Sequence, residues 1–328
     1  MTPLVITVIV LALAFDFLNG IHDSSNIVAT MISSRAISPK TALAMTAVAE
    51  FCGPFFFGVA VATTIGHEIV DAAAISTQVL IAALIAAIFW NLLTWYLGFP
   101  SSSSHALVGG FVGSVIMGAG WGAIKLAGLT KILIALFTSP IIGYMVGFLI
   151  LRLIFLLAWD ASPKINWIFK RGQVVTALGL ALSHGANDAQ KSMGIITLAL
   201  VTGGFLDSFQ VPLWVIVICA SMIALGTAVG GWKLIRTLGA KFYKIKPVDG
   251  FATQLTSALV ILTASLLGGP VSTTQVVSSA IMGVGSAERK NKVRWGVAQE
   301  IATGWLLTIP ATALVGAGIY WIVIKIVP

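Results

Sequence analysis

The chain has 328 residues, of which 58% are hydrophobic and 9% are charged. Soluble domains carry roughly 25% charged residues, so this composition, with a mean hydropathy of +1.01, excludes a soluble protein and indicates an integral membrane protein. The net charge of +8 does not indicate nucleic-acid binding, because the basic residues lie mainly between the apolar segments, where they orient a membrane protein.

Ten apolar segments are expected to form helical membrane elements, since roughly 20 apolar residues span a bilayer as a helix. In chain order they cover residues 3–34, 41–65, 78–97, 99–119, 131–158, 174–203, 211–232, 251–267, 270–285 and 297–326. The first and the sixth are expected to be interrupted, because each contains a polar motif with glycine and an acid. Irregular backbone at membrane depth is tolerated only where protein buries it or a water-filled cavity lies beside it, so these breaks predict an internal site.

The two polar motifs are alike: NGIHDSSN at residues 19–26 and HGANDAQK at residues 184–191. They place Asp23 and Asp188 at matching positions, 165 residues apart. An ionisable side chain at membrane depth is rare and costly, so it is a functional-site hypothesis by default. Two such acids at matching positions predict a duplicated binding site.

A second pair of motifs is rich in hydroxyl groups. GFPSSSSHALVGG at residues 98–110 matches GGPVSTTQVVSSA at residues 268–280, and Pro140 recurs as Pro310 at the same offset of 170 residues. Three features in the same order at nearly one offset indicate an internal duplication. Repeats of this kind are typical of secondary transporters.

The charges of the loops orient the two halves. The loops at 233–249 and 286–294 are basic and are expected to face the cytoplasm, whereas the loop at 66–77, which has acids but no Lys or Arg, faces outward. Because each half has an odd number of elements, about five, the second half runs through the membrane in the opposite sense. The sequence therefore predicts an all-α polytopic membrane protein with an inverted-topology repeat and broken helices at the midplane. Its parts are a first repeat (1–158), a short cytoplasmic linker (159–173) and a second, inverted repeat (174–328).

The acid motifs are expected to bind cations. The pseudo-symmetry brings Asp23 and Asp188 together, and two buried carboxylates need compensating cations, which sodium ions or protons supply. Oxygen-rich side chains and carbonyls freed by a helix break suit a hard cation. For Glu50, which also lies in apolar sequence, a packed and protonated carboxyl is favoured. The candidate cation ligands are Asp23, Asp188, Asn19, Asn187 and Glu300.

The hydroxyl motifs are expected to bind an anion, because clustered donors at a helix start combine with the positive end of the helix dipole. Serine and threonine in membrane helices also serve as contacts between helices. Four consecutive serines after a proline, echoed in the other half, nevertheless favour a ligand role. The candidate anion ligands are Ser102, Ser103, Ser104, Ser272, Thr273, Thr274, Asn26 and Lys191.

Two of these assignments stay open. Lys191 occupies the position of Asn26 in the other motif, and its pairing with Asp188 is favoured over a role in attracting substrate. The histidines of the motifs are either satisfied core side chains, or one of them carries or gates a proton. They are His22, His105 and His184.

The motifs resemble the signatures of the PiT family of inorganic phosphate transporters: residues 15–30 are similar to the first and residues 184–194 to the second. The resemblance covers essentially the whole chain. It implies a symporter of inorganic phosphate, driven by sodium ions or protons, in an inverted-repeat fold that often assembles as a homodimer. By the matched motifs, the acid site would contain Asp23, Asn26, Asn187 and Asp188, and the six Ser and Thr residues would be the phosphate ligands.

The chain departs from the family pattern in two places. His22 stands where the second motif has Asn187, and Gln275 stands where a histidine is frequent in the family. Some compact bacterial relatives look like sulfate permeases, so sulfate stays an alternative anion.

The resulting hypothesis is transport by alternating access. Cations neutralise the two acids, hydroxyls from both repeats hold the anion, and the halves expose the site to one face at a time. No cofactor beyond the transported cation is expected, and the expected location is the lipid bilayer of the plasma membrane. A membrane-embedded hydrolase or phosphotransferase is a weaker alternative, because an enzyme needs one asymmetric site. A channel is disfavoured because buried acids bind cations too tightly for fast conduction.

Overall fold

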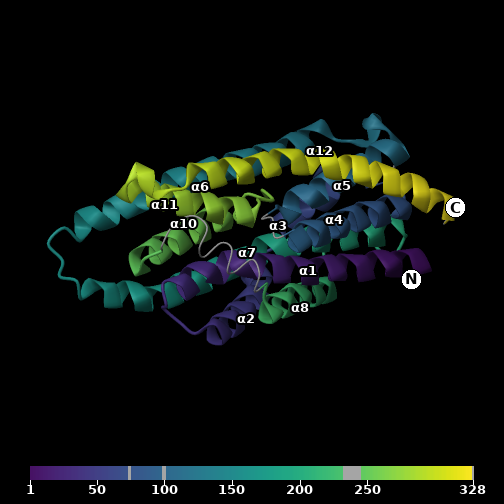
Figure 1. Ribbon diagram of the computed structural model, residues 1–328. Helices are drawn as coiled ribbons and strands as arrows, with labels where there is room; N and C mark the ends of the chain where they lie inside the picture. Colours follow the sequence, from purple (N-terminus) through teal and green to yellow (C-terminus); the bar gives the residue numbers. More distant parts are fainter. Residues whose placement is uncertain (73–74, 98–100, 232–244, 327–328) are drawn as a thin grey trace.

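The protein is a bundle of long helices (Figure 1). The computed structural model describes residues 1–72, 75–97, 101–231 and 245–326. Within these ranges every regular element is a helix, apart from one isolated bridge between Val70 and Ile124. The predicted all-α class is therefore confirmed. Most of the basic loop expected at 233–249 lies outside the described residues.

A helix overlaps each of the ten expected segments in the described part of the chain. The helices of the first half are α1 (Pro3–Ser33), α2 (Pro39–Phe57), α3 (Ala60–Thr63), η1 (Thr64–Glu68), α4 (Thr77–Leu97), α5 (Ser103–Ala119), η3 (Trp121–Ala123) and α6 (Leu126–Leu157). Those of the second half are α7 (Ile165–Thr202), α8 (Leu213–Val229), α10 (Pro247–Leu266), α11 (Thr273–Glu288), η4 (Lys290–Lys292) and α12 (Trp295–Ile326). The segment expected as a linker, 159–173, thus contains the start of α7.

Several helices are long and apolar enough to cross a membrane. Among the described residues four pass this test alone: α1, α4, α6 and α12. The helix α2 and the segment Ala60–Glu68 that follows it, bent by 72°, make a fifth if they count as one span. The helices α5 and α8 are apolar but shorter, and α7 carries many polar residues.

The expectation that α1 and α7 are interrupted at their acid motifs is wrong, because both helices run through these motifs without a break. Their glycines serve close packing instead. A Cβ on Gly20 would lie 2.2 Å from the carbonyl oxygen of Ile223 on α8, and one on Gly185 would lie 2.0 Å from that of Glu50 on α2. Each glycine therefore lets a neighbouring helix backbone approach the motif, and no backbone carbonyl is freed there.

Helix ends do meet the site at the hydroxyl motifs. The helices α5 and α11 start at Ser103 and Thr273. Each is capped by the preceding serine: Ser102 Oγ accepts from His105 N at 3.1 Å, and Ser272 Oγ accepts from Gln275 N at 3.3 Å. A serine at this position satisfies one of the free N–H groups of a helix start. The residues before α5, 98–100, lie outside the described part of the chain.

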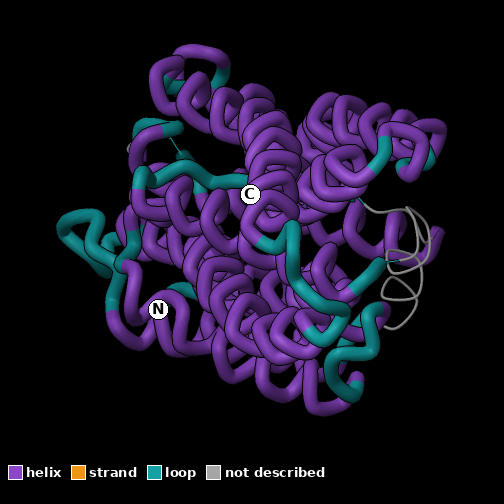
Figure 2. The backbone as a smooth tube through the Cα atoms, turned by 90° about the vertical axis from the view of Figure 1, so that its left-hand side faces the viewer, coloured by secondary structure: helices purple, strands orange, loops and turns teal. Residues whose placement is uncertain are grey.

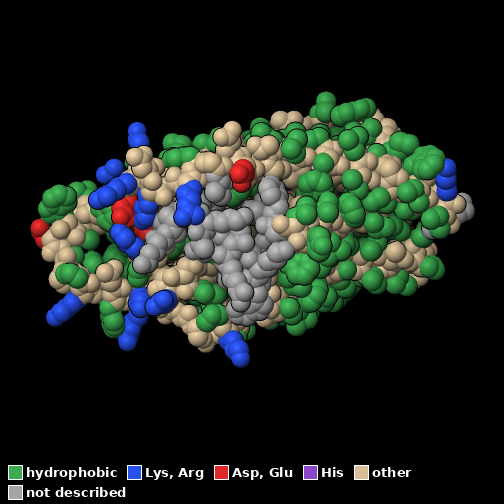
Figure 3. Space-filling view, in the orientation of Figure 1, with side chains coloured by type: hydrophobic (Ala, Val, Ile, Leu, Met, Phe, Trp, Pro, Cys, Tyr) green, Lys and Arg blue, Asp and Glu red, His purple; other side chains and the backbone are tan. Residues whose placement is uncertain are grey.

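The helices lie roughly along one common direction, and the view in Figure 2 looks along the bundle. Apolar side chains cover much of the surface, as expected for contact with lipid (Figure 3). On the face drawn there, most of the basic side chains gather at one end of the bundle. The loop between α6 and α7 lies at this end, opposite the two chain termini (Figure 1).

Candidate functional site

Two acids from different halves of the chain meet in the interior. Asp23 of α1 and Asp188 of α7 are both fully buried. Together with His184 they form a group in which one ligand atom from each residue lies within 4.8 Å of the others. The predicted meeting of Asp23 and Asp188 is therefore present in the structure.

Asp23 accepts hydrogen bonds from both hydroxyl motifs. Its Oδ1 accepts from Asn26 Nδ2 at 2.8 Å and from Thr274 Oγ1 at 2.8 Å. Its Oδ2 accepts from Thr273 Oγ1 at 3.2 Å and from Ser103 Oγ at 3.5 Å. The start of α5 and the start of α11 thus converge on one carboxylate.

Asp188 has a comparable set of donors. Its Oδ2 accepts from Thr273 Oγ1 at 3.2 Å and from Asn19 Nδ2 at 3.2 Å. Its Oδ1 accepts from the ammonium group of Lys191. Thr273 Oγ1 lies 3.2 Å from an oxygen of each acid, and because a hydroxyl has one proton to donate, it stands between the acids and donates to one of them at a time.

His184 joins the two acids to a third one. Its Nε2 lies 3.2 Å from Asp188 Oδ2 and 3.6 Å from Asp23 Oδ2. Its Nδ1 forms a hydrogen bond with Glu50 Oε1. A second imidazole, that of His22, has its Nδ1 3.2 Å from Asp23 Oδ1. The centre therefore contains three carboxyl groups, two imidazoles and one ammonium group, none of which is exposed by more than 3%.

Four of the six predicted hydroxyl residues lie at this centre, and the other two do not. Ser103, Thr273 and Thr274 donate to the acids, and Ser104 Oγ accepts from Lys191 Nζ at 2.6 Å. Ser102 and Ser272 are the helix caps described above. They hold the starts of α5 and α11 in place without contacting the acids.

Asn187, for which the sequence predicts a position beside the acids, contacts the end of α10 and the loop between α10 and α11. Its Nδ2 donates to Ser265 Oγ at 2.9 Å and to the Gly269 carbonyl at 3.2 Å, and its Oδ1 accepts from Val271 N at 3.2 Å. This side chain therefore fixes the backbone that leads into α11.

The placement of Glu300 as a cation ligand is wrong. Glu300 lies on the exposed face of α12, outside the buried group of acids. The apolar sequence around Glu300 predicts an internal position, but α12 turns this residue outward.

Phosphate transporters are the proteins that this chain resembles throughout. The model of the phosphate transporter family, PHO4, matches residues 19–316. The chain belongs to this family. Members of the family are transporters, so the protein is a membrane transporter and not an enzyme.

Relatives and one solved structure agree with this assignment. A probable low-affinity inorganic phosphate transporter of Bacillus subtilis is 45% identical over 97% of each chain. A protein of the same description from Rhizobium meliloti is 43% identical over 97% of this chain and 96% of its own. The solved structure described as the sodium-dependent phosphate transporter matches with a TM-score of 0.92, at 25% identity, over 100% of both chains.

Two buried acids of the transporter were not predicted as site residues. The sequence predicts a packed carboxyl for Glu50; the structure buries it and pairs it with His184. Asp16 lies on α1, before the acid motif in the sequence, and accepts a hydrogen bond from Ser192 Oγ at 2.5 Å. Both stand in apolar sequence, which was the signal that could have identified them.

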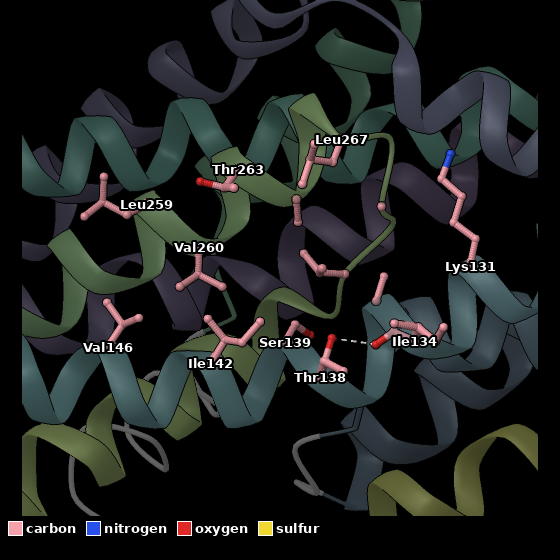
Figure 4. Close-up of a pocket in the computed structure, with 14 residues that line it drawn as sticks. Lys131, Ile134, Thr138, Ser139, Ile142, Val146, Leu259, Val260, Thr263 and Leu267 are labelled. Carbon is pink, nitrogen blue, oxygen red and sulfur yellow. Dashed lines mark hydrogen bonds between the residues drawn. The ribbon is translucent and has the colours of Figure 1, made fainter.

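An apolar cleft on the outside of the transporter is distinct from this centre. It lies between α6 and α10, with Lys131 at one end (Figure 4). Among its lining residues, Ile134 is 57% exposed and Leu259 is 48% exposed, so the cleft faces the lipid. Lys131 is already paired with Glu68 at 2.9 Å. The cleft therefore lacks the free positive charge that an oxyanion requires.

Proposed function

We propose that the protein is a symporter that couples the movement of inorganic phosphate to that of sodium ions or protons across the plasma membrane. The observation that carries this proposal is the pair Asp23 and Asp188, buried together under the starts of α5 and α11. The family and the relatives support phosphate as the substrate. The coupling is inferred from the charges of the site.

The charges make a cation necessary for binding the anion. Two unit charges about 4 Å apart interact by about 4 kcal/mol at an effective dielectric constant of about 20. A phosphate beside the hydroxyls of Thr273 and Ser103 would meet both carboxylates at such distances. Cation binding beside these acids removes this repulsion, so anion and cation bind together. Transport of one without the other is then disfavoured.

Hydroxyl donors would hold the phosphate once the cations are bound. Ser103, Ser104, Thr273 and Thr274 now make hydrogen bonds within the centre. When a cation takes over the carboxylate oxygens, the hydroxyls of Ser103, Thr273 and Thr274 become free to donate to an oxyanion. The starts of α5 and α11 add positive dipole ends beside them.

The carboxylates also favour phosphate over sulfate. Near pH 7 phosphate carries hydroxyl groups that donate to an ionised carboxylate, whereas sulfate only accepts. A site that keeps one carboxylate within reach therefore prefers phosphate. Sulfate is the second candidate substrate and serves as the competitor in the test below.

An inverted repeat with alternating access is supported by the helix contacts. The pairing of α1 with α8 corresponds to that of α7 with α2, the pairing of α1 with α4 to that of α7 with α10, and the pairing of α5 with α12 to that of α11 with α6. Such reciprocal contacts are expected of two halves related by a two-fold axis, and we place the boundary near the loop between α6 and α7. Residues 1–158 and 174–328 would be the two repeats.

Polar side chains close the path from the acids towards the basic end of the bundle. Gln254 on α10 donates to Thr30 on α1 at 2.9 Å and accepts from Thr176 on α7 at 2.7 Å. Nearer that end, Ser34 donates to Gln173 at 2.9 Å. These contacts join α1, α7 and α10, and we propose that they separate when the site opens to this face.

Uptake of radiolabelled phosphate into proteoliposomes tests the proposal. Sodium and proton gradients are imposed separately, with excess unlabelled sulfate as competitor. We expect gradient-driven accumulation that sulfate does not suppress. Accumulation of labelled sulfate instead would reassign the substrate, and equal uptake with and without either gradient would contradict the coupling.

A further inference from the structure

The ammonium group of Lys191 is fully engaged inside the protein. Its Nζ donates to Asp188 Oδ1, to Ser104 Oγ at 2.6 Å and to the Val271 carbonyl at 3.1 Å. An ammonium group has three donors, and here all three are used. The side chain is 1% exposed, so none of its donors points into open space.

Asn26 has the same surroundings in the first half, but it is neutral. Its Nδ2 donates to Asp23 Oδ1 at 2.8 Å and to Thr274 Oγ1 at 2.9 Å. Each residue follows its acid by three positions, and each contacts the second hydroxyl of α5 or α11, which is Ser104 for Lys191 and Thr274 for Asn26. At this position the two halves thus share one geometry and differ by one positive charge.

This difference makes the two acids unequal. Asp188 has a permanent positive partner, whereas Asp23 contacts the neutral amide of Asn26 and the imidazole of His22, whose Nδ1 lies 3.2 Å from Asp23 Oδ1. The remaining groups that face both acids, His184 and the hydroxyl of Thr273, are shared between them. An imidazole is positive only when it has taken up a proton, which also comes from solution. The charge of Asp23 must therefore be balanced by a cation from solution, either a sodium ion or a proton, and that of Asp188 need not be.

We propose that Lys191 is a fixed cation that takes the place of one transported cation. The transporter would then move one cation fewer per phosphate than a site with an amide in both halves. This inference rests on the proposed cation coupling and specifies it. It also assigns Lys191 a role other than substrate contact, because all of its donors already hold Asp188, Ser104 and the start of α11.

The test is the number of charges moved per phosphate, which is measured whether the coupling ion is sodium or a proton. Purified protein in proteoliposomes is held at fixed membrane potentials with potassium and valinomycin, and the equilibrium accumulation of labelled phosphate is recorded. Lys191→Asn recreates the first half in the second, and Lys191→Arg keeps the charge. One additional charge changes the accumulation ratio about tenfold for each 59 mV of potential.

In Lys191→Asn we expect the phosphate accumulation ratio to change by an additional factor of about ten for each 59 mV of membrane potential. Lys191→Arg should behave as the unchanged protein. The reciprocal variant Asn26→Lys places an ammonium group beside Asp23 and should lose one charge per phosphate. If Lys191→Asn does not fold, Asn26→Lys alone tests the proposal, because an unchanged number of charges per phosphate in this variant also contradicts it.

Two results would overturn the role of Lys191. One is an equal net charge moved per phosphate in Lys191→Asn and in a cation-coupled unchanged protein, whether that charge is zero or not. The other is a Lys191→Asn protein that unfolds at the normal temperature but no longer binds phosphate at any sodium concentration or pH, which would make Lys191 a phosphate ligand. If the unchanged protein moves no cation with phosphate, the coupling itself fails, so the two failures are distinguishable.

Discussion

Asn19 of α1 donates a hydrogen bond to Asp188 of α7 at 3.2 Å, and thus contacts the acid of the opposite half. At the matching position of α7 stands His184, and its Nε2 lies 3.6 Å from Oδ2 of Asp23 on α1. Each acid therefore contacts a side chain from the motif of the other helix. A change of charge at one acid alters contacts in both halves, which is the physical basis on which cation binding and a movement of the halves can be linked.

Replacement of either acid should abolish coupled uptake. In Asp23→Asn a charge interaction of about 3 kcal/mol with a bound cation is lost, which corresponds to a fall in cation-driven phosphate uptake of at least about 100-fold. Asp188→Asn leaves the ammonium group of Lys191 unpaired, and its repulsion of a cation near Asp23 should reduce uptake by a similar factor. The measurement is initial uptake into proteoliposomes under a cation gradient. Asp160→Asn, at an exposed acid in the loop after α6, is the control. Normal cation-driven uptake in either acid variant would refute the proposed role.

The two acid variants should differ in stability, although both should fold. Asp188→Asn leaves the buried ammonium group of Lys191 without its carboxylate, and removing one partner of a buried ion pair costs about 3–5 kcal/mol. Asp23→Asn leaves no such cation. Thermal unfolding in detergent should therefore show a lower midpoint for Asp188→Asn. The double variant Asp188→Asn with Lys191→Asn should recover most of the loss, because the two residues are in contact and their effects are not additive. Equal losses in both single variants would contradict this.

Glu50 and Glu300 form a matched pair for a third prediction. Glu50→Gln removes the charge that orients His184 between the acids, and loss of such a buried, hydrogen-bonded partner should reduce phosphate uptake at least about tenfold, or about 1.4 kcal/mol. Glu300→Gln changes an exposed side chain and should leave uptake within a factor of two. Both are measured as initial rates at saturating phosphate. A larger effect at Glu300 than at Glu50 would show that the buried pair has no function.

The sequence was sufficient to identify the central residues but not their surroundings. The repetition of acids and hydroxyl clusters at matching positions identified Asp23, Asp188 and the starts of α5 and α11, because a duplicated site leaves a duplicated pattern. The orientation of a side chain on a helix depends on which neighbours the helix contacts, and no local pattern states this. For that reason Glu300 was expected inside and Glu50 was not expected to contact His184.

The same limit explains the error at the acid motifs. Glycine beside polar residues is typical of a helix break, but it also permits two helix backbones to touch. The neighbours that distinguish these cases, Ile223 beside Gly20 and the backbone of Glu50 beside Gly185, come from distant parts of the sequence. Only the packed structure separates the two interpretations.

Close packing at the acid motifs gives the last prediction. A methyl group added by Gly20→Ala or Gly185→Ala would lie 2.2 Å and 2.0 Å from a neighbouring backbone oxygen, so the helices must move apart. Overpacking of this kind costs about 1–3 kcal/mol and displaces the acids. Gly318→Ala on α12, where no atom lies within 4 Å of the added Cβ, is the matched control and should stabilise its helix by about 1 kcal/mol or less. Thermal unfolding and phosphate uptake are measured together. We expect the unfolding midpoint and the rate of phosphate uptake to fall in Gly20→Ala and Gly185→Ala, but not in Gly318→Ala. An unaffected Gly185→Ala protein would mean that α2 and α7 do not pack at this position.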